Sequence, residues 1–347
     1  MKNLLNSNNS LIIYKMIKKL LILARKTVKK LLYPVIYSYP GYILYDFTAR
    51  LGGYKKERKR INKIIGYYPN LKNPQSFNEK VLWKKLYDRN PLLPIVSDKY
   101  RVREYIREVL GEAEANRILV PLLYVTGKPQ EIPFDDLSGE YIIKPNHASG
   151  RFIIAENIEN QKRYTIVEGS ESTVLYESKE ARSEIITTLK RWLLHPFGFY
   201  LHEWAYQKIK RRIIIEKLLR DSNGKIPTDY KLTVFYGACH SIMVVYDRLI
   251  DKSIARYTPD WEYINVKVRI KKAIYRPKPE NLQSLLYLAE SLGKNFDFIR
   301  ADLYLLDKHI YFGEITSYPV SGALYFNPAS YDFELGSKWK LVPKYWN

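Results

Sequence analysis

Two carboxylates on neighbouring predicted strands are the residues of this chain best suited to chemistry. Asp302 lies inside the apolar run 298–306, and Glu314 lies near the end of the run 309–315. A two-residue turn separates the runs and predicts an antiparallel hairpin that places the carboxylates side by side. Carboxylates placed in this way repel each other unless a cation lies between them. Oxygen ligands on a rigid sheet suit Mg²⁺, which completes its coordination shell with water and substrate phosphates.

Arg300 supports the interpretation of this hairpin as a site. It lies two residues before Asp302 and therefore on the same face of the predicted strand. We expect its guanidinium group to pair with the acids or to meet an anion that the metal also meets. The alternative is that Asp302 and Glu314 merely face solvent on an exposed sheet.

A lysine at the end of a strand is a second candidate for chemistry. Residues 141–144 predict a strand that ends in Lys144, and a loop through Ser149 and Gly150 follows it. A lysine beside such a small-residue loop can hold an anion, and the amide groups of the loop can cradle phosphate. The pattern is not GxxxxGK[ST], so it does not predict a P-loop. An ordinary hairpin loop fits the same residues.

A third stretch places polar backbone beside aliphatic side chains. The isoleucines at 213–215 lead directly into Glu216 and Lys217, and two leucines follow, ending at Leu219. Backbone polar groups next to aliphatic walls are what an adenine ring needs. The end of an ordinary strand gives the same pattern.

Lys231 and Arg248 add cations to the second half of the chain. Lys231 stands at the start of a predicted strand, and Arg248 follows another strand predicted at 241–245. Both can face phosphate or carboxylate.

Composition excludes several other kinds of site. Cys239 is the single cysteine, so an internal disulfide, a CxxC redox site and a cysteine zinc site are excluded. The five histidines form no HExxH motif and no i,i+4 pair. No GxGxxG motif follows a predicted strand, so a Rossmann unit is not supported. We therefore expect neither a zinc enzyme nor a dinucleotide-binding domain.

The net charge of +21 is concentrated near the N-terminus. Residues 1–80 hold 17 of the 57 Lys and Arg residues against 3 of the 36 acids, which leaves 40 against 33 for the rest of the chain. A strongly basic protein ordinarily suggests a nucleic-acid partner. Because the excess belongs to one end, we expect no nucleic acid to bind.

Residues 11–32 predict a basic amphipathic helix. Its lysines and arginines follow i,i+3 and i,i+4 spacing on one side, and Ile, Leu, Ala and Val fill the other. The lysines interrupt every stretch long enough to span a bilayer, and no signal-peptide cleavage site follows. Such a helix lies on anionic lipid, or else packs on the protein's own body. The Tyr-rich residues 33–47 suit the lipid headgroup zone or a packing role.

The remaining chain predicts a helical region followed by mixed strands and helices. Residues 48–75 look like a solvated basic connector, and Ser76 begins a helix through a capping box with Glu79. The other predicted elements are helices at 97–110, 180–195 and 281–293, and strands at 118–125, 141–144, 152–155, 165–167, 213–218, 232–235 and 241–245. The fold class is therefore α+β.

The order of these motifs resembles that of the ATP-grasp superfamily, and within it the TupA-like branch, which is named from teichuronopeptide synthesis. The resemblance covers about residues 76–341, and members of the branch are often labelled glycosyltransferases. The phrases that carry it are SFNEK from Ser76, LYDRNP from Leu86, SDKY from Ser97, IKPNH from Ile143, DYK from Asp229, FGE from Phe312 and YPVSG from Tyr318.

The resemblance implies an ATP-grasp fold, in which two α+β lobes clasp ATP. Together with the basic N-terminal pattern, which lies outside the resemblance, it divides the chain into a basic segment (1–47), a connector and helical region (48–117), an N-terminal lobe (118–215) and a C-terminal lobe with the metal site (216–347). It implies ATP binding by Lys99, Lys144, Ser149, Gly150, Glu216, Lys217, Leu219 and Lys231, Mg²⁺ ligation by Asp302 and Glu314, and catalytic roles for Arg300 and Arg248. Many ATP-grasp ligases have Asn where this chain has Thr316, whose hydroxyl is a poorer metal ligand. The resemblance therefore does not decide between one Mg²⁺ ion and two.

The activity that follows is ATP-dependent ligation of a carboxylate to an amine through an acyl phosphate. The resemblance implies glycan-linked substrates, a role in making capsule or a similar cell-surface polysaccharide, and a cytoplasmic address at the inner membrane face. A glycosyltransferase is the alternative, but a metal-dependent one needs an Asp-x-Asp motif, and the sequence has none. A basic scaffold that binds nucleic acid or lipid would leave Lys144, Asp302 and Glu314 unexplained.

Overall fold

The computed structural model describes residues 35–159, 161–221, 224, 226–246, 253–268, 271–272 and 275–342. The basic helix predicted at 11–32 and the predicted catalytic residue Arg248 lie outside these residues. By its contacts the chain divides into two compact units, Met1–Tyr54 and Lys55–Asn347. None of the described helices is long and apolar enough to cross a membrane.

The first unit contains the helix α2 (Tyr39–Leu51). Ser38 caps its N-terminus by accepting a hydrogen bond from the amide of Gly41 at 3.2 Å, and Pro40 occupies the first turn, where its missing N–H costs nothing. Gly52 caps the other end.

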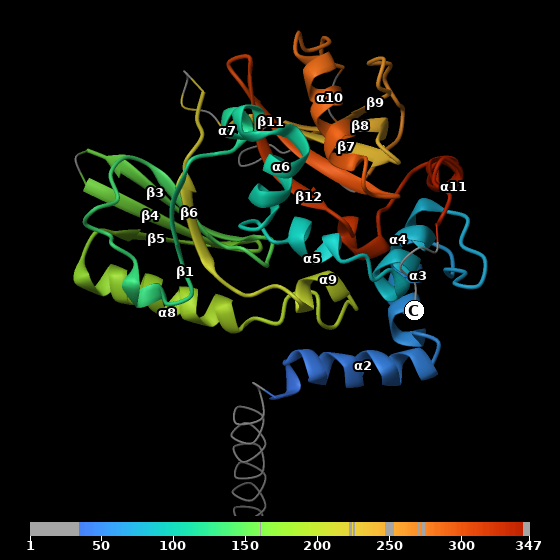
Figure 1. Ribbon diagram of the computed structural model, residues 1–347, viewed down its shortest axis with the longest axis horizontal. Coiled ribbons are helices and arrows are strands. Elements are labelled where there is room, and N and C mark those ends of the chain that lie inside the picture. The colour runs from blue at the N-terminus through green and yellow to red at the C-terminus, as the bar shows by residue number, and fades with distance from the viewer. Residues whose placement is uncertain are drawn as a thin grey trace, which may run out of the picture. The chain divides into compact units, whose positions relative to one another are not determined.

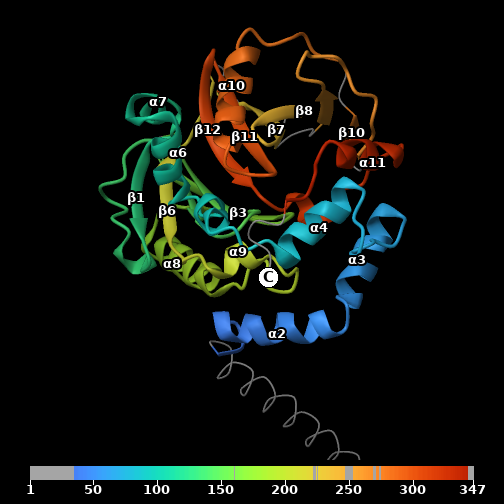
Figure 2. The ribbon, with the colours of Figure 1, turned by 45° about the vertical axis from the view of Figure 1, so that its right-hand side comes forward.

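The second unit begins with short helices and continues into two sheets. The helices are α3 (Lys55–Ile65), α4 (Phe77–Tyr87), α5 (Leu92–Ser97), α6 (Val102–Leu110) and α7 (Glu112–Ile118). The capping box predicted at Ser76 is present, with the Ser76 hydroxyl bonded to the Glu79 amide and the Glu79 carboxylate bonded to the Ser76 amide. In both ribbon views α6 lies between β6 of one sheet and β11 of the other (Figures 1 and 2).

The first sheet is antiparallel, with the order β1-β6-β2-β3-β4-β5. Its strands are β1 (Leu122–Thr126), β2 (Tyr141–Pro145), β3 (Arg151–Ile158), β4 (Gln161–Glu168), β5 (Glu171–Tyr176) and β6 (Ile213–Lys217). The helix α8 (Lys179–Leu194) covers one face and buries Ile185, Leu189 and Trp192 in a core with strand residues such as Ile143 and Ile215. In the chain, the short helix α9 (Trp204–Gln207) and a basic segment at 208–212 connect α8 to β6.

The second sheet has the order β10-β9-β8-β7-β11-β12. Its strands are β7 (Thr228–Phe235), β8 (Ala238–Tyr246), β9 (Ser253–Tyr257), β10 (Lys271–Lys272), β11 (Ile299–Leu306) and β12 (His309–Thr316), with the helix α10 (Leu282–Gly293) against β7, β8 and β11. The short helices η2 (Pro319–Gly322) and α11 (Ser330–Ser337) follow β12. These two sheets with their helices confirm the predicted α+β fold.

Three sequence expectations about elements were wrong. Residues 55–65 form the helix α3 rather than a solvated connector, because Ile61 and Ile65 recur at helical spacing and are buried beneath the basic run. Ile118 ends α7 instead of starting a strand. The strand β5 was missed because it is a mostly exposed edge strand and lacks a buried apolar side.

Candidate active site

The hairpin β11–β12 places the two predicted metal carboxylates opposite each other. Asp302 pairs in register with Glu314 across the hairpin and with Lys231 of β7 on its other side. The connecting residues Asp307 and Lys308 have φ angles of 45° and 70°, as a two-residue hairpin turn of the primed type requires. The predicted hairpin and its turn are therefore confirmed.

The carboxylate of Asp302 is buried between two cations. Its side chain is 1% exposed, and it accepts hydrogen bonds from Arg300 Nε at 2.6 Å, from Arg300 Nη2 at 2.7 Å and from the ammonium group of Lys231. Lys231 also pairs with Asp229 at 2.8 Å. The sequence predicted that the two carboxylates repel each other unless a cation lies between them, and that Arg300 pairs with the acids or meets an anion. Arg300 does pair with the acids, and Lys231 and Lys99 add further positive charge beside them.

Glu314 is held more loosely than Asp302. Its side chain is 33% exposed, and it lies 3.4 Å from Lys99 Nζ and 3.8 Å from Arg300 Nη2. Although burial opposes the charge of Arg300, the carboxylates of Asp302 and Glu314 raise its pKa above the ordinary value. Thr316, whose hydroxyl contacts both Arg300 and Glu314, completes the cluster.

The donor set fits Mg²⁺ in part. Two carboxylates on paired strands are the oxygen donors that Mg²⁺ takes from a protein when phosphates and water supply the rest. Among the described residues, no group of three or more Asp, Glu, His or Cys side chains is arranged to hold a metal ion. Glu314 and Asp302 both line the pocket, but hydrogen bonds from Arg300 and Lys231 already occupy most of the lone pairs of the Asp302 carboxylate.

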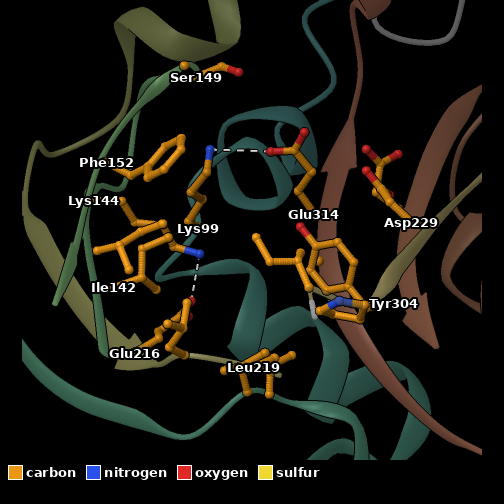
Figure 3. Close-up of a pocket in the computed structure, with 18 of the residues that line it drawn as sticks. Lys99, Ile142, Lys144, Ser149, Phe152, Glu216, Leu219, Asp229, Tyr304 and Glu314 are labelled. Atoms are coloured by element: carbon orange, nitrogen blue, oxygen red, sulfur yellow. Dashed lines mark ion pairs between the residues drawn. The ribbon is translucent and has the colours of Figure 1, made fainter. Parts of the chain in front are cut away.

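A pocket between the two sheets brings the predicted residues together (Figure 3). Those of the first sheet and its loops are Lys144, Ser149, Gly150, Glu216, Lys217 and Leu219; those of the second sheet are Lys231, Asp302 and Glu314; and Lys99 precedes α6. Arg300 stands behind Asp302 and does not line the pocket. The roles given to these residues remain predictions, but the structure places them around one space.

Lys144 and Glu216 form an ion pair on the wall made by the first sheet. Lys144 Nζ lies 2.6 Å from a Glu216 oxygen (Figure 3). Arg103 of α6 approaches the other Glu216 oxygen at 3.4 Å. The sequence treated Lys144 as a phosphate ligand and Glu216 as part of an adenine site. Their direct contact means that these two predicted subsites adjoin.

Two of the backbone amides after Glu216 already donate hydrogen bonds within the protein. The amide of Lys217 donates to the carbonyl of Pro121 at 3.0 Å, and the amide of Leu218 donates to the carbonyl of Glu140 at 3.1 Å. Within this predicted adenine-reading stretch, Leu219 therefore supplies the next amide that can face a base.

Asn146 is a buried residue beside the site to which the sequence patterns assigned no role of its own. It is fully buried, and its side-chain amide donates to Asp98 Oδ1 at 2.8 Å and to the Lys210 carbonyl at 3.0 Å, while its Oδ1 accepts from the Arg212 amide at 2.8 Å. Its carbonyl accepts from the Lys99 amide at 3.0 Å. Asn146 therefore joins the segment that carries Lys99 to the loop that follows Lys144.

Lys99 itself reaches both sheets. Its ammonium group donates to the Ala148 carbonyl at 3.0 Å and lies 3.4 Å from Glu314 on β12 (Figure 3). The neighbouring Gly150 has a φ of 70°, a left-handed conformation that favours glycine. In the same loop, burial and then the Arg211 guanidinium lower the pKa of His147 to about 3, so its imidazole is neutral.

Tyr304 and Gly313 also line the pocket, although the sequence patterns assigned them no role. Tyr304 lies two residues after Asp302, on the same strand face as Arg300, and it lines the pocket. A Cβ at Gly313 would lie 2.9 Å from the Asp302 carbonyl and 3.0 Å from the Tyr304 ring. Glycine therefore precedes Glu314 because the two strands and the tyrosine ring approach too closely for any side chain.

Two sheets that face a common pocket lined with lysines and carboxylates fit the ATP-grasp arrangement expected from the motifs. The family model "TupA-like ATPgrasp" matches residues 79–340. The chain therefore belongs to the TupA-like ATP-grasp family, which confirms the family and fold predicted from its motifs.

Solved structures give a weaker likeness. A D-alanine–D-alanine ligase from Bacillus anthracis is 15% identical, with a TM-score of 0.36 over 64% of this chain and 57% of that one. Its counterpart from Helicobacter pylori is 15% identical, with a TM-score of 0.37 over 78% and 68%. The D-cycloserine synthetase DcsG is 13% identical, with a TM-score of 0.33 over 72% of each chain.

This chain therefore spans less than two-thirds of the length of the Bacillus anthracis ligase. At these scores the likeness carries no argument about substrates. No curated protein matches the chain.

Proposed function

We propose that this protein is an ATP- and Mg²⁺-dependent carboxylate–amine ligase that forms an amide through an acyl phosphate. The observation that carries the proposal is the sequence of charged groups across one pocket. Lys144 stands beside Glu216 at one wall, Lys99 bridges the middle, and Lys231 stands beside Asp302 at the other wall. A row of cations that ends at oxygen donors suits a polyphosphate chain whose far end meets a metal.

The ion pairs suggest a direction for the nucleotide. If Glu216 and the Leu219 amide meet the adenine, Lys144 is placed to contact the phosphate nearest the base, since its ammonium group lies 2.6 Å from Glu216. Lys99 and Lys231, which pair with Glu314 and Asp302, then face the far phosphates. The γ-phosphate therefore lies next to the second sheet.

The chemistry follows from charge. An oxygen of the substrate carboxylate attacks the γ-phosphorus, the bond to the β-phosphate oxygen breaks, and ADP leaves with the electron pair. The amine then attacks the acyl carbon, and inorganic phosphate leaves as the amine loses a proton. Mg²⁺ held by Asp302 and Glu314 would neutralise charge on the phosphates. Arg300 would stabilise the oxyanion on the acyl carbon after exchanging a bond to Asp302 for the substrate, since it does not line the pocket as it stands. Arg248 is the candidate for a second catalytic cation.

The biological setting is part of the proposal. We infer a uronic acid joined to an amino acid, or an amino acid joined to an amino sugar, within the synthesis of capsule or a similar cell-surface polysaccharide. Residues 11–32 would hold the enzyme on the anionic inner face of the membrane, where lipid-linked glycans are built. The family name and the basic N-terminal sequence support this setting.

Hydroxylamine trapping tests the reaction without knowledge of the natural amine. The purified protein with ATP, Mg²⁺, hydroxylamine and a panel of uronic acids and amino acids should yield a hydroxamate from at least one acid, with release of ADP and phosphate. Arg300→Lys keeps the charge but loses the paired geometry, so it should lower the hydroxamate yield far more than the ATP affinity. Sugar transfer from a nucleotide sugar without ATP would contradict the proposal in favour of a glycosyltransferase.

A further inference from the structure

The helix α2 exposes an apolar stripe along one side. Ile43, Leu44, Phe47 and Leu51 are 47%, 66%, 56% and 74% exposed. At about 100° per residue, these four side chains lie within an arc of about 100° around the helix axis. Four large apolar side chains on one side of one helix form an exposed patch rather than scattered surface residues.

The chain just before α2 also exposes apolar side chains. A Cβ at Gly41 would lie only 2.2 Å from the Ile36 carbonyl, so the backbone of Val35 and Ile36 folds tightly against the first turn. These two side chains are 66% and 39% exposed. We call the exposed side chains of Val35, Ile36, Ile43, Leu44, Phe47 and Leu51 the α2 face.

The single acid of residues 1–54 is turned away from the α2 face. Asp46 lies about 60° outside the arc of the stripe. It is buried, as is Tyr42 one turn before it, and it accepts a hydrogen bond from the Tyr54 hydroxyl at 3.2 Å. Arg50 stands exposed at the border of the stripe. The α2 face therefore combines apolar side chains with positive charge and presents no carboxylate.

We propose that the α2 face lies in the interfacial layer of an anionic lipid bilayer. A bilayer surface takes apolar side chains into the boundary between headgroups and acyl chains, and it attracts the cations that flank them. The 34 residues before Val35 contain eight Lys and Arg residues and no acid, so the attraction is strengthened next to this face. Tyr37, Tyr39 and Tyr45, each partly exposed, suit the headgroup level.

The α2 face lies outside residues 11–32, so its contact with lipid would be additional to theirs. This contact does not depend on the ligase reaction. Flotation of the full-length protein with vesicles tests it, using phosphatidylcholine alone and phosphatidylcholine mixed with phosphatidylglycerol. The double variant Leu44→Glu/Phe47→Glu should lower partitioning into the anionic vesicles by more than about tenfold, because two large apolar side chains are lost from the lipid.

A matched control separates this effect from the change in net charge. Val174 and Tyr176 on β5 are 49% and 53% exposed, so Val174→Glu/Tyr176→Glu removes similar apolar groups and adds the same charge elsewhere. This control should bind the anionic vesicles like the natural protein. A polarity-sensitive fluorophore on Phe47→Cys should shift to the blue with anionic vesicles and much less with phosphatidylcholine alone.

Three results would overturn the proposal. Unchanged vesicle binding of the α2 double variant would leave residues 11–32 as the whole membrane contact. A fluorophore at position 47 that is blue-shifted without vesicles, and loses the shift when residues 1–34 are removed, would show that the chain covers its own α2 face. Dimers that the charge substitutions dissociate would assign the face to a second copy.

Discussion

The two walls of the pocket differ in how they carry charge. The wall from the first sheet has the apolar residues Ile142 and Ile154 around one close ion pair, Lys144–Glu216. The wall from the second sheet concentrates Asp229, Asp302 and Glu314 with their cations. The first wall suits a flat neutral base with little rearrangement, whereas the second is neutralised internally and has to exchange partners when phosphate and metal arrive.

The largest effects are expected from substituting the carboxylates Asp302 and Glu314 of the second wall, and the two variants should differ in stability. Asp302→Asn and Glu314→Gln should each lower turnover by more than about a hundredfold, because a metal ligand is lost. Asp302→Asn should also lower the free energy of unfolding by about 3–5 kcal/mol, since it leaves Arg300 and Lys231 beside a neutral group. Glu314 is more exposed and more loosely paired, so its variant should keep nearly full stability.

Initial rates against Mg²⁺ concentration and urea unfolding measure these two quantities. Equal losses of stability in both variants would contradict the difference drawn between the two carboxylates. Full activity in both would contradict the metal site itself.

The next effect concerns the first wall. Lys144→Ala should weaken ATP binding by about tenfold or more, the amount that a charge-assisted hydrogen bond to phosphate contributes. Among the residues that the structure describes, the variant also leaves Glu216 with Arg103 as its remaining counter-ion. Titration calorimetry with ADP and with AMP measures the effect, and a loss confined to ADP would place Lys144 at the β-phosphate instead of the phosphate nearest the base.

A smaller effect should follow from Asn146→Ala. This residue positions Lys99 and touches no ligand itself, so the variant should weaken ATP binding severalfold by displacing that lysine. A double-mutant cycle with Lys99→Ala measures the coupling, which should be about 0.5–3 kcal/mol. Additive losses would show that Asn146 supports the fold without positioning the lysine.

The smallest effect is a dependence of stability on pH. The pKa of His147 is about 3 in the folded protein against about 6.5 in an unfolded chain, so the unfolded state binds the extra proton between these values. The stability that depends on the neutral imidazole is fully present above about pH 6.5. It falls as the pH drops towards 3, by up to roughly 1.4 kcal/mol per unit.

Urea unfolding between pH 7 and pH 4.5 measures this slope. His147→Gln should flatten it, whatever the variant does to stability at pH 7. An unchanged slope would show that His147 does not carry it.

The sequence predicted those parts of the site that depend on local patterns. Alternation and a two-residue turn predicted the hairpin with Asp302 and Glu314, and strand ends predicted Lys144 and Glu216. Asn146 was missed because its partners lie 48 to 66 residues away, so nothing near it distinguishes it from a turn residue. The neutralisation of Asp302 by Lys231 was missed for the same reason, since that contact joins strands 71 residues apart.

The contacts of Lys99 have a consequence for the kinetics of binding. One ammonium group joins the Ala148 carbonyl of the first sheet to Glu314 of the second. These contacts use two of the three N–H donors of the ammonium group, which leaves one for a phosphate oxygen. A bound phosphate is then tied through one ammonium to both sheets, so parting of the sheets, and with it release of the nucleotide, should be slower in the complex than in Lys99→Ala.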